Sequence, residues 1–335
     1  MTWQARPYQQ GDEHEILKLR RAVFGQVDPV RALLDTWRWQ FQCNPAGPGF
    51  IMLAEDRGDI VGQYAAIPVR MLVDGEEILC GYSCDTMVHP DYHRQRIFVS
   101  LANLVYEDME INHGIHSVWG FPNENSMPGF TKKLGWQSAG CFLARITLPK
   151  VSALLGDRRK ERRPLYLGKG VEAKPIMEFG PEFDQLWREH KPQTGIIQVR
   201  DRAYLQWRYL GVAGFEYEPF GVFLENRLQG YFVLRFQTIS GVRVCSLVDS
   251  FPILDPKTMD GLATAVRDYG ALRGCAMAVA LFPRSLDRQA SQWGFYAVPQ
   301  RIAPKVFHLA GRFVGETKWL DDSRWWLSLG DTDVV

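Results

Sequence analysis

The hydrophobic and polar positions of residues 88–136 predict a strand, a basic turn, an amphipathic helix, a second strand and a short helix, closed by Gly135 and Trp136. A helix that begins directly after such a turn points its first backbone N–H groups outward, and its dipole favours an anion at that end. The turn is therefore a candidate site for a pyrophosphate group.

The same order of landmarks occurs twice along the chain, at a long period. The paired segments are residues 35–39 with 205–209, 50–64 with 220–232, 84–88 with 248–251, 120–122 with 281–283, and 134–136 with 293–295. Five similar landmarks in one order predict two copies of a single α/β fold, at residues 1–148 and 172–310. We expect residues 149–171 to form a linker and residues 311–335 to form a tail that docks on the domains.

The predicted linker contains a basic run, Arg158 to Arg163, between Gly156 and Pro164. Such a run is typical of a solvated connection, and the alternative is a cationic lid over a ligand that carries phosphate. The predicted tail is rich in tryptophan, which indicates packing against the domains. We interpret its end as a turn that carries two carboxylates, Asp331 and Asp333, and we expect them to bind the acceptor substrate.

The first copy resembles the acyl-CoA-binding core of the GCN5-related N-acetyltransferases (GNAT). The strand end matches at Val88, Pro90 and Tyr92, and the fold closes with a similar Leu134-Gly135-Trp136. The loop departs from the family pattern, since Arg96 and Phe98 replace its two glycines. The resemblance implies a mixed α/β sheet in two tandem GNAT-like domains, of which the second is degenerate. It also implies acetyl-CoA, or another acyl-CoA, as co-substrate.

The resemblance implies a set of residues that contact the acyl-CoA. They are Met87, Val88, Arg94, Gln95, Arg96, Ile97, Phe98 and Asn123. The loop amides would face the pyrophosphate, and the two arginines would pair with phosphate oxygens, because guanidinium groups bind such oxygens in pairs. Asn123 has an equally good interpretation as a helix N-cap. The alternative is that the loop has lost the cofactor, since a side chain at a glycine position can block close approach.

Acyl transfer to an amine needs a group that accepts the amine's proton and a way to stabilise the leaving thiolate. Asp85 is the main candidate for the base, three residues before Val88 on the same strand. His89 is a second candidate, and Tyr82 and Tyr92 are candidates to supply a proton. Thr131 occupies the position at which many members of the family have a tyrosine that acts as the general acid, and a threonine hydroxyl is a poor acid. Each of these residues also has a structural interpretation, as a paired strand-end carboxylate, a cap or a half-buried aromatic.

The second copy lacks a phosphate loop. The residues before its helix predict a capped start, with Asp255 as N-cap and Pro256 at the first helical position. A carboxylate at that point would repel a pyrophosphate. We therefore expect the first copy alone to bind acyl-CoA, and the second to shape the acceptor site.

The composition of the chain narrows the range of possible functions further. The chain has 335 residues, 46% of them hydrophobic, and a net charge of +1, which gives no support to nucleic-acid or membrane binding. No apolar run approaches the ~20 residues of a membrane span. The six cysteines form no Cys-x-x-Cys pair, so neither a metal site nor a disulfide framework is indicated. We expect a cytoplasmic protein with free thiols, as a monomer or a dimer.

These patterns predict an acyl-CoA-dependent N-acyltransferase that acts on a small amine such as an amino sugar or an amino acid derivative. One alternative enzyme is an aminoacyl or acyl-carrier-dependent transferase. The alternative from another class is a ligand sensor without catalytic activity, built from two copies of the fold whose loops have lost the family pattern.

Overall fold

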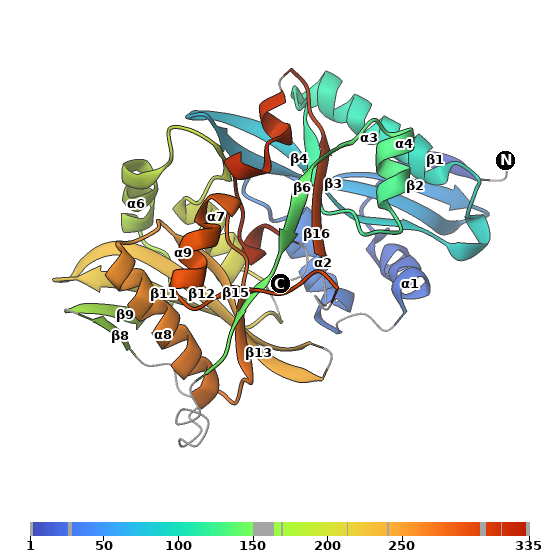
Figure 1. Ribbon diagram of the computed structural model, residues 1–335. Helices are drawn as coiled ribbons and strands as arrows, with labels where there is room; N and C mark the ends of the chain where they lie inside the picture. Colours follow the sequence, from blue (N-terminus) through green and yellow to red (C-terminus); the bar gives the residue numbers. More distant parts are fainter. Residues whose placement is uncertain are drawn as a thin grey trace.

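The computed structural model describes residues 3–25, 29–149, 164–168, 170–212, 214–239, 241–301, 306–315 and 317–332. The chain forms two mixed sheets with helices packed against them (Figure 1). The whole predicted basic run, Arg158 to Arg163, and Asp333 lie outside the described residues.

The first sheet takes most of its strands from the N-terminal half. Its main path runs in the order β1 (Gln4–Pro7), β2 (Phe50–Asp56), β3 (Asp59–Val73), β4 (Glu76–Val88), β5 (Val118–Gly120), β16 (Val306–Arg312) and β6 (Gln137–Leu143). At its margin β10 (Ile196–Gln198) pairs with β3 and with β17 (Trp325–Trp326). The C-terminal segment therefore contributes to this sheet as well.

The second sheet runs in the order β15 (Tyr296–Ala297), β7 (Arg145–Thr147), β14 (Met277–Ala280), β13 (Val242–Phe251), β12 (Arg227–Ile239), β11 (Tyr217–Leu224), β9 (Val171–Pro175) and β8 (Leu165–Gly168). Because β8 belongs to this sheet, the end of the predicted linker is structured. Both sheets have a central antiparallel meander followed by a parallel strand, β5 or β14. The repeat seen in the sequence is thus a repeat of strand order.

Each half contributes an internal strand to the sheet of the other half. Strand β16 lies between β5 and β6 in the first sheet, and β7 lies between β14 and β15 in the second. Figure 1 shows β6 and β16 side by side where the two halves meet. Neither sheet is complete without a strand from the other half of the chain, so the two halves do not form independent domains.

Helices cover both faces of the first sheet. The α-helices in the described residues are α1 (Glu13–Phe24), α2 (Leu34–Phe41), α3 (Ile97–His113), α4 (Met127–Lys133), α6 (Glu182–His190), α7 (Arg202–Leu205), α8 (Pro256–Leu272) and α9 (Asp287–Gln292). Strand β3 is buried on both faces, because alternate side chains enter different cores. Tyr64 and Ala66 pack with α3, whereas Ala65 and Ile67 join the core that contains α1 and α2. This second core continues into the other half of the molecule.

Candidate functional site

A gap in the first sheet creates the main cleft. Strands β4 and β5 run parallel but pair only at Gly81–Val118 and Tyr82–Trp119. Beyond Tyr82, β4 continues to Val88 without this neighbour. Its register with β3 shifts opposite Tyr64, and Asp85 has a φ of 49°. This is a β-bulge, which bends a strand and redirects its side chains.

The cleft at this gap has a volume of about 650 Å³. Its wall contains β4 residues 83–88, residues 120–123 at the end of β5 and beyond it, and residues of α1, α3 and α4. Of the residues that the sequence suggested, it brings together Asp85, Met87, Val88, Phe98 and Asn123. The cleft therefore extends from the face of the sheet that α3 and α4 cover to the face that α1 covers.

The basic turn leads into α3 with two residues in the left-handed conformation, Arg94 at φ 66° and Arg96 at φ 64°. Arg96 is the N-cap of α3, and its side chain makes no capping hydrogen bond. The first bond of the helix runs from Ser100 N–H to the Arg96 carbonyl, so the N–H groups of residues 97–99 have no helical acceptor. The backbone thus keeps at Arg96 the geometry that a glycine would favour, and the start of α3 is open to an anion.

Phe98, at the second replaced glycine position, has an ordinary helical backbone and causes no strain there. Its ring packs edge-on against Phe130 at 5.0 Å between centroids and lies beside Gly129. A side chain at Gly129 would approach the Phe98 ring to 3.2 Å. Phe98 therefore fixes α4 against α3 and lines the cleft with an apolar surface.

Asp85 forms an ion pair with Arg20 of α1, at 2.5 Å from Arg20 Nη1 to Asp85 Oδ2. The two side chains are only 7% and 8% exposed. Arg20 Nε is buried without a hydrogen-bond partner among the described residues. The bulge is held further by Gln63, whose amide donates to the Asp85 carbonyl at 2.8 Å. The carboxylate therefore faces the cleft as half of a buried pair.

The other candidate acids and bases lie elsewhere. Tyr92 donates to Asp56 at 2.7 Å, and this hydrogen bond raises its pKa. His89 accepts from Asp91 N–H through Nδ1 and caps a short 3-10 helix. Thr131 donates to the Met127 carbonyl of its own helix. The structure does not bring Tyr92, His89 or Thr131 to the cleft beside Asp85.

Asn123 lines the cleft and also caps a turn, because its side chain accepts from Ser126 N–H at 2.9 Å. The N-cap of α4 is Ser126, so Asn123 stabilises the turn that precedes the helix and does not cap the helix itself. Its contact with acyl-CoA stays a prediction.

Asp331 lies in a buried network. Arg200 pairs with both Asp249 and Asp331, and all three side chains are fully buried. Asp249 also accepts from Tyr209 and Tyr231 at 2.9 Å each. Burial is the main cause of the raised pKa of Asp331. The network fastens the C-terminal segment to the second sheet.

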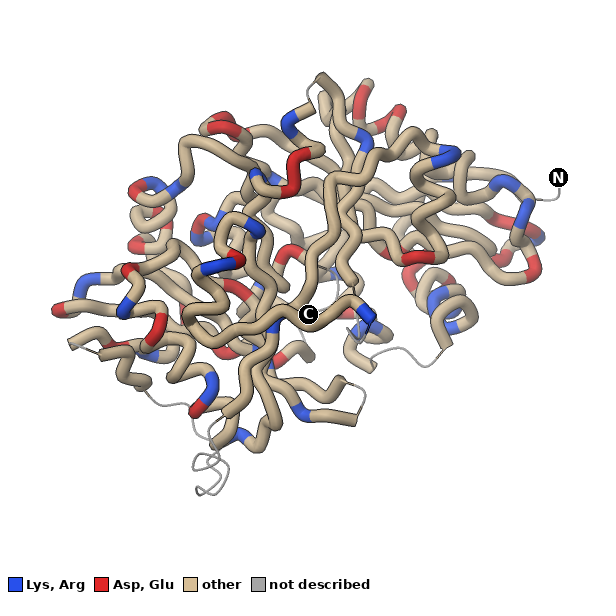
Figure 2. The backbone as a smooth tube through the Cα atoms, in the orientation of Figure 1, with Lys and Arg blue, Asp and Glu red and all other residues tan. Residues whose placement is uncertain are grey.

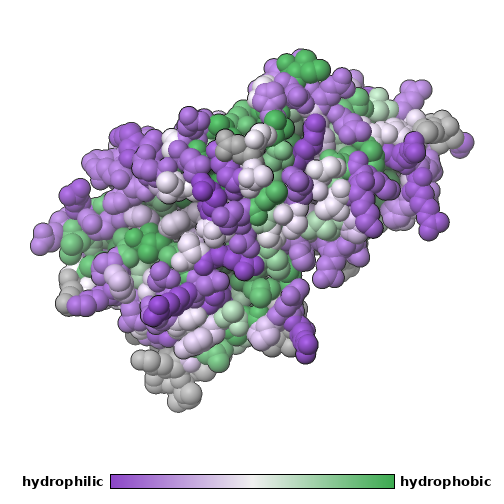
Figure 3. Space-filling model, turned by 45° about the horizontal axis from the view of Figure 1, so that its top comes forward, coloured by the Kyte–Doolittle hydropathy of each residue, from purple (hydrophilic) through white to green (hydrophobic). Residues whose placement is uncertain are grey.

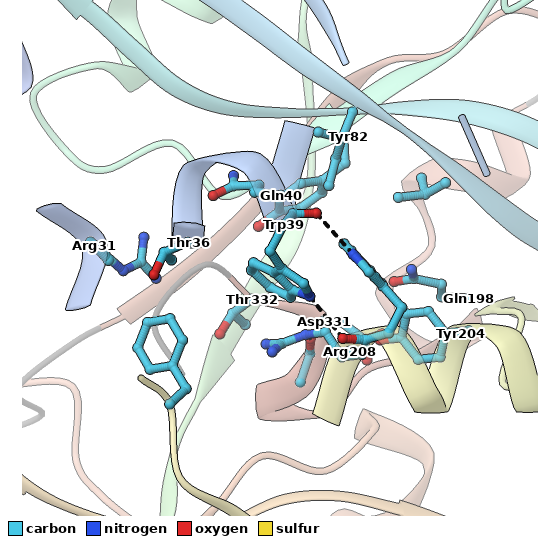
Figure 4. A pocket seen from close by; sticks show the side chains of 15 residues that line it. Arg31, Thr36, Trp39, Gln40, Tyr82, Gln198, Tyr204, Arg208, Asp331 and Thr332 are labelled. Carbon is cyan, nitrogen blue, oxygen red and sulfur yellow. Dashed lines mark hydrogen bonds between the residues drawn. The ribbon is translucent and has the colours of Figure 1, made fainter. Parts of the chain in front are cut away.

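A second, interior cavity lies where the two halves meet, with a volume of about 70 Å³ (Figure 4). It is lined by side chains of α2, β3, β4 and residues 198–215, and by Asp331 and Thr332. Arg31 lines both this cavity and the main cleft. The predicted substrate residue Asp331 therefore lies at this hollow and not at the main cleft, and its side chain is fully buried.

Sequence reasoning missed four residues at these sites: Arg20, Arg31, Ser83 and Tyr64. Ser83 lines the cleft and donates to Tyr64, whose hydroxyl lies 2.6 Å from that of Tyr106. Burial raises the pKa of Tyr106 to about 12, so the chain of hydroxyl groups stays neutral at ordinary pH. Arg20 and Arg31 precede the strands by tens of residues, and no local pattern marks them.

No group of histidine, cysteine or carboxylate side chains suited to a metal ion occurs in the described ranges. Within those ranges, too, no helix is both long and apolar enough to cross a membrane. Basic and acidic residues are interspersed over the whole fold (Figure 2), and hydrophilic and hydrophobic residues alternate on the face shown in Figure 3.

Residues 4–139 match the family model for an acetyltransferase (GNAT) domain. The comparison with curated proteins gives no match. Among solved structures, a GCN5-related N-acetyltransferase from Anabaena variabilis has a TM-score of 0.66 at 12% identity, over 94% of this chain and 74% of that one. A probable N-acyltransferase from Enterococcus faecalis also has a TM-score of 0.66 at 12% identity, over 94% of this chain and 73% of that one.

Another similar structure is Saccharomyces cerevisiae N-myristoyltransferase with bound myristoyl-CoA. Its TM-score is 0.61 at 10% identity, and the match covers 93% of this chain and 82% of the yeast chain. At identities this low the structural similarity shows a shared fold alone, and this fold extends over nearly the whole of this chain. The tandem α/β architecture predicted from the repeat is confirmed by these neighbours and by the two sheets.

Proposed function

The first domain of this chain is a GNAT domain, and from that premise we propose that the protein is an acyl-CoA-dependent N-acyltransferase that transfers an acetyl group to a small amine. One contrast carries the proposal. The start of α3 is uncapped at the mouth of a large cleft, whereas the start of α8 is blocked by Asp255, which accepts from Lys257 N–H and Thr258 N–H. A single acyl-CoA site in the first domain follows from this difference.

The open end of α3 suits a pyrophosphate. Its three free N–H groups and the helix dipole favour an anion, and Arg94 and Arg96 stand exposed on the turn beside it. The pantetheine arm would follow the unpaired edge of β4 toward the bulge at Asp85. Val88 and Met87 of β4 line this path, and Phe98 and Phe130 provide its apolar side. Arg94, Gln95, Arg96 and Ile97 keep the cofactor role proposed for the loop.

In the reaction, the amine nitrogen attacks the thioester carbonyl, the C–N bond forms, the C–S bond breaks, and the thiolate leaves with the electron pair of that bond. Backbone N–H groups of the bulged β4 would polarise the carbonyl. Asp85 would accept the proton of the amine or hold the ammonium group, with Arg20 fixing its orientation. The proton returns to the thiolate through solvent, because Tyr92 and Thr131 donate to other groups.

The test is calorimetric titration with coenzyme A and acetyl-CoA, followed by free-thiol release across a panel of amino sugars, amino acids and polyamines. We expect one coenzyme A per chain, and thermal stabilisation of about 2.7 kcal/mol when the ligand reaches 100 times its Kd. Binding without turnover on any amine would support the sensor alternative. Absence of both binding and turnover would remove the enzyme proposal, while turnover with only an acylated carrier protein would favour the carrier-dependent transferase.

A further inference from the structure

A chain of hydrogen-bonding side chains runs from the main cleft into the core under α3. The indole N–H of Trp136 donates to the Tyr106 hydroxyl at 2.9 Å, and that hydroxyl lies 2.6 Å from the hydroxyl of Tyr64. Ser83 Oγ lies 3.0 Å from the Tyr64 hydroxyl. The tyrosines and the tryptophan are no more than 5% exposed, whereas Ser83 is half-buried. Of the three hydroxyl groups, that of Ser83 therefore belongs to the residue in the wall of the cleft.

Ser83 lies at the apex of the gap in the first sheet. The parallel pairing of β4 with β5 ends at Tyr82, so Ser83 is the first β4 residue beyond it. Ser83 pairs with Ala66 of β3, which packs in the core with α3. Directly opposed residues of neighbouring strands share one face of a sheet. Ser83 therefore faces the α3 side of the cleft, while Asp85 pairs with α1 on the other side.

Gly120, the last residue of β5, keeps the apex open beside Ser83. A Cβ atom at Gly120 would lie 3.0 Å from the Ser83 carbonyl oxygen, 3.6 Å from the Trp136 ring and 3.8 Å from the Ser83 Cβ atom. A side chain there would fill the space next to the serine. The glycine thus allows a ligand group to approach the backbone at this point.

The chain holds one more donor than it has hydrogen bonds. An indole N–H can only donate, and each hydroxyl group has a single proton, so four protons serve three hydrogen bonds. Because Ser83 donates to Tyr64, the surplus proton is on one of the two tyrosines. Neither tyrosine hydroxyl has a further acceptor among the described residues. A buried donor without an acceptor costs free energy.

An acceptor atom placed beside Ser83 removes this cost. Hydroxyl groups rotate without movement of their oxygen atoms, and either tyrosine can be the donor in the hydrogen bond between them. Tyr106 then donates to Tyr64, Tyr64 donates to Ser83, and Ser83 donates into the cleft. All four protons are used in this arrangement, so the buried chain favours an acceptor at the apex.

The pKa values decide what the chain can give to that acceptor. Burial raises the pKa of Tyr106 to about 12, and burial also raises the pKa of Tyr64. An ordinary thiol has a pKa of about 8.5, so a thiolate is too weak a base to take a proton from these hydroxyl groups. The chain therefore stays neutral and offers a hydrogen bond, which is stronger when the acceptor is ionised.

We propose that Ser83 donates a hydrogen bond to the sulfur of the acyl-CoA thioester and stabilises the thiolate that leaves. The amine nitrogen forms the C–N bond, the C–S bond breaks, the sulfur keeps the electron pair of that bond, and the O–H bond of Ser83 stays intact. The proton of the amine still reaches the thiolate through solvent. This catalytic role rests on the proposed acyl transfer, but the contact with the thiolate of coenzyme A does not.

The first test uses coenzyme A alone and needs no turnover. Calorimetry compares it with desulfo-coenzyme A, which has a hydrogen atom in place of the thiol, from about pH 6.5 to about pH 9, around the ordinary pKa of a thiol. A donor that favours the thiolate lowers the pKa of the bound thiol, so the affinity for coenzyme A rises with pH up to the pKa of the free thiol. We expect the ratio of the two affinities to rise about tenfold more in the wild type than in Ser83→Ala.

The comparison with desulfo-coenzyme A removes the effect of other titrating groups. The charged or titratable residues that line the described wall of the cleft are Arg20, Arg31, Cys84, Asp85 and His93. These groups meet both ligands, so their titration cancels in the ratio of affinities. What remains is the response of the thiol itself.

Turnover then tests the catalytic role. Ser83→Ala should lower kcat about tenfold and leave the KM of acetyl-CoA near that of the wild type, because the hydrogen bond strengthens as charge develops on the sulfur. Ser83→Thr keeps the hydroxyl group and should retain most of kcat. Tyr64→Phe keeps Ser83 but removes the donor behind it, and should lower kcat by about threefold. Thr86→Val is the matched control, since Thr86 lines the same cleft and its buried hydroxyl has no partner among the described residues; it should leave kcat unchanged.

An equal rise of the affinity ratio in the wild type and in Ser83→Ala would overturn the proposal. If the ratio rises as expected but no amine is acylated, the contact with the thiolate stands and the proposed function fails. If Ser83→Ala acylates an amine at the rate of the wild type, the proposed function stands and the role of Ser83 fails. Absence of coenzyme A binding would overturn both.

Discussion

Mutations can separate two roles of Asp85: its structural role in the ion pair with Arg20 and its proposed role as the proton acceptor. Asp85→Asn keeps the size of the side chain and removes its charge, which leaves Arg20 buried and unneutralised. Removing one partner of a buried pair costs about 3–5 kcal/mol. Both side chains are below 10% exposed and lie 2.5 Å apart, so we expect a loss of about 3 kcal/mol in the free energy of unfolding.

A second substitution restores the balance. Arg20→Met removes the unpaired cation, and the double variant Arg20→Met/Asp85→Asn should recover most of the lost stability, because an apolar group of similar length replaces the charge. Urea unfolding of the wild type, both single variants and the double variant gives the coupling energy directly. Asp249→Asn is the matched control, since Asp249 lies at the corresponding bulge of β13 and pairs with Arg200.

Kinetics then distinguish the structural role from the chemical one. If Asp85 accepts the proton, the rate constant kcat falls about a hundredfold in both the single and the double variant, even where stability returns. The affinity for coenzyme A should stay near that of the wild type. A double variant with restored stability and full kcat would refute the catalytic role, and an unchanged midpoint in Asp85→Asn would refute the buried pair.

Three further outcomes can be measured. Arg96→Glu should weaken coenzyme A binding at least about tenfold by calorimetry, and an unchanged affinity would show that the pyrophosphate does not bind at this turn. Arg96→Gly relieves the left-handed strain at φ 64° and should raise the free energy of unfolding in urea by about 0.5–1 kcal/mol. Arg200→Met should unfold at lower urea than the wild type and should regain more stability as the pH is lowered. Arg200 lowers the raised pKa of Asp331, and a carboxyl whose pKa is raised in the folded state gains stability as the pH falls through it. Equal dependence of stability on pH in the variant and the wild type would contradict this. A thiol reagent should modify exposed Cys43 first in the native protein, and not Cys80, whose pKa burial raises to about 12; mass spectrometry of the early adduct decides.

Local sequence signals predicted the parts of this fold that local chemistry determines. Asp255 and Pro256 do form the N-cap and first residue of α8, which confirms that prediction. The basic turn does hand over to a helix at Ile97. Both features depend on backbone groups within a few residues of the named side chains, so composition and spacing were enough.

The same signals could not reveal contacts between distant segments. Asp85 meets Arg20 across 65 residues, and Arg200 meets Asp331 across 131. The strand exchange follows from β-ladder pairing between residues in opposite halves, and hydrophobic periodicity carries no information about which edge a strand joins. For Tyr92 the sequence suggested a role as proton donor, and only the fold shows that Asp56 receives its hydroxyl hydrogen bond.

These distant contacts give the second half a structural role in the first sheet. Strand β16 completes the first sheet between β5 and β6, directly beside the gap that forms the cleft, and β10 with β17 extends β3 on the other side. Residues 198–215 and Asp331 close the interior cavity from the second half. The first half therefore supplies the open start of α3 and the cleft, and the second half supplies strands that complete the first sheet. A chain cut between the halves would lose β10, β16 and β17 from the first sheet and β7 from the second, because each sheet takes strands from both halves.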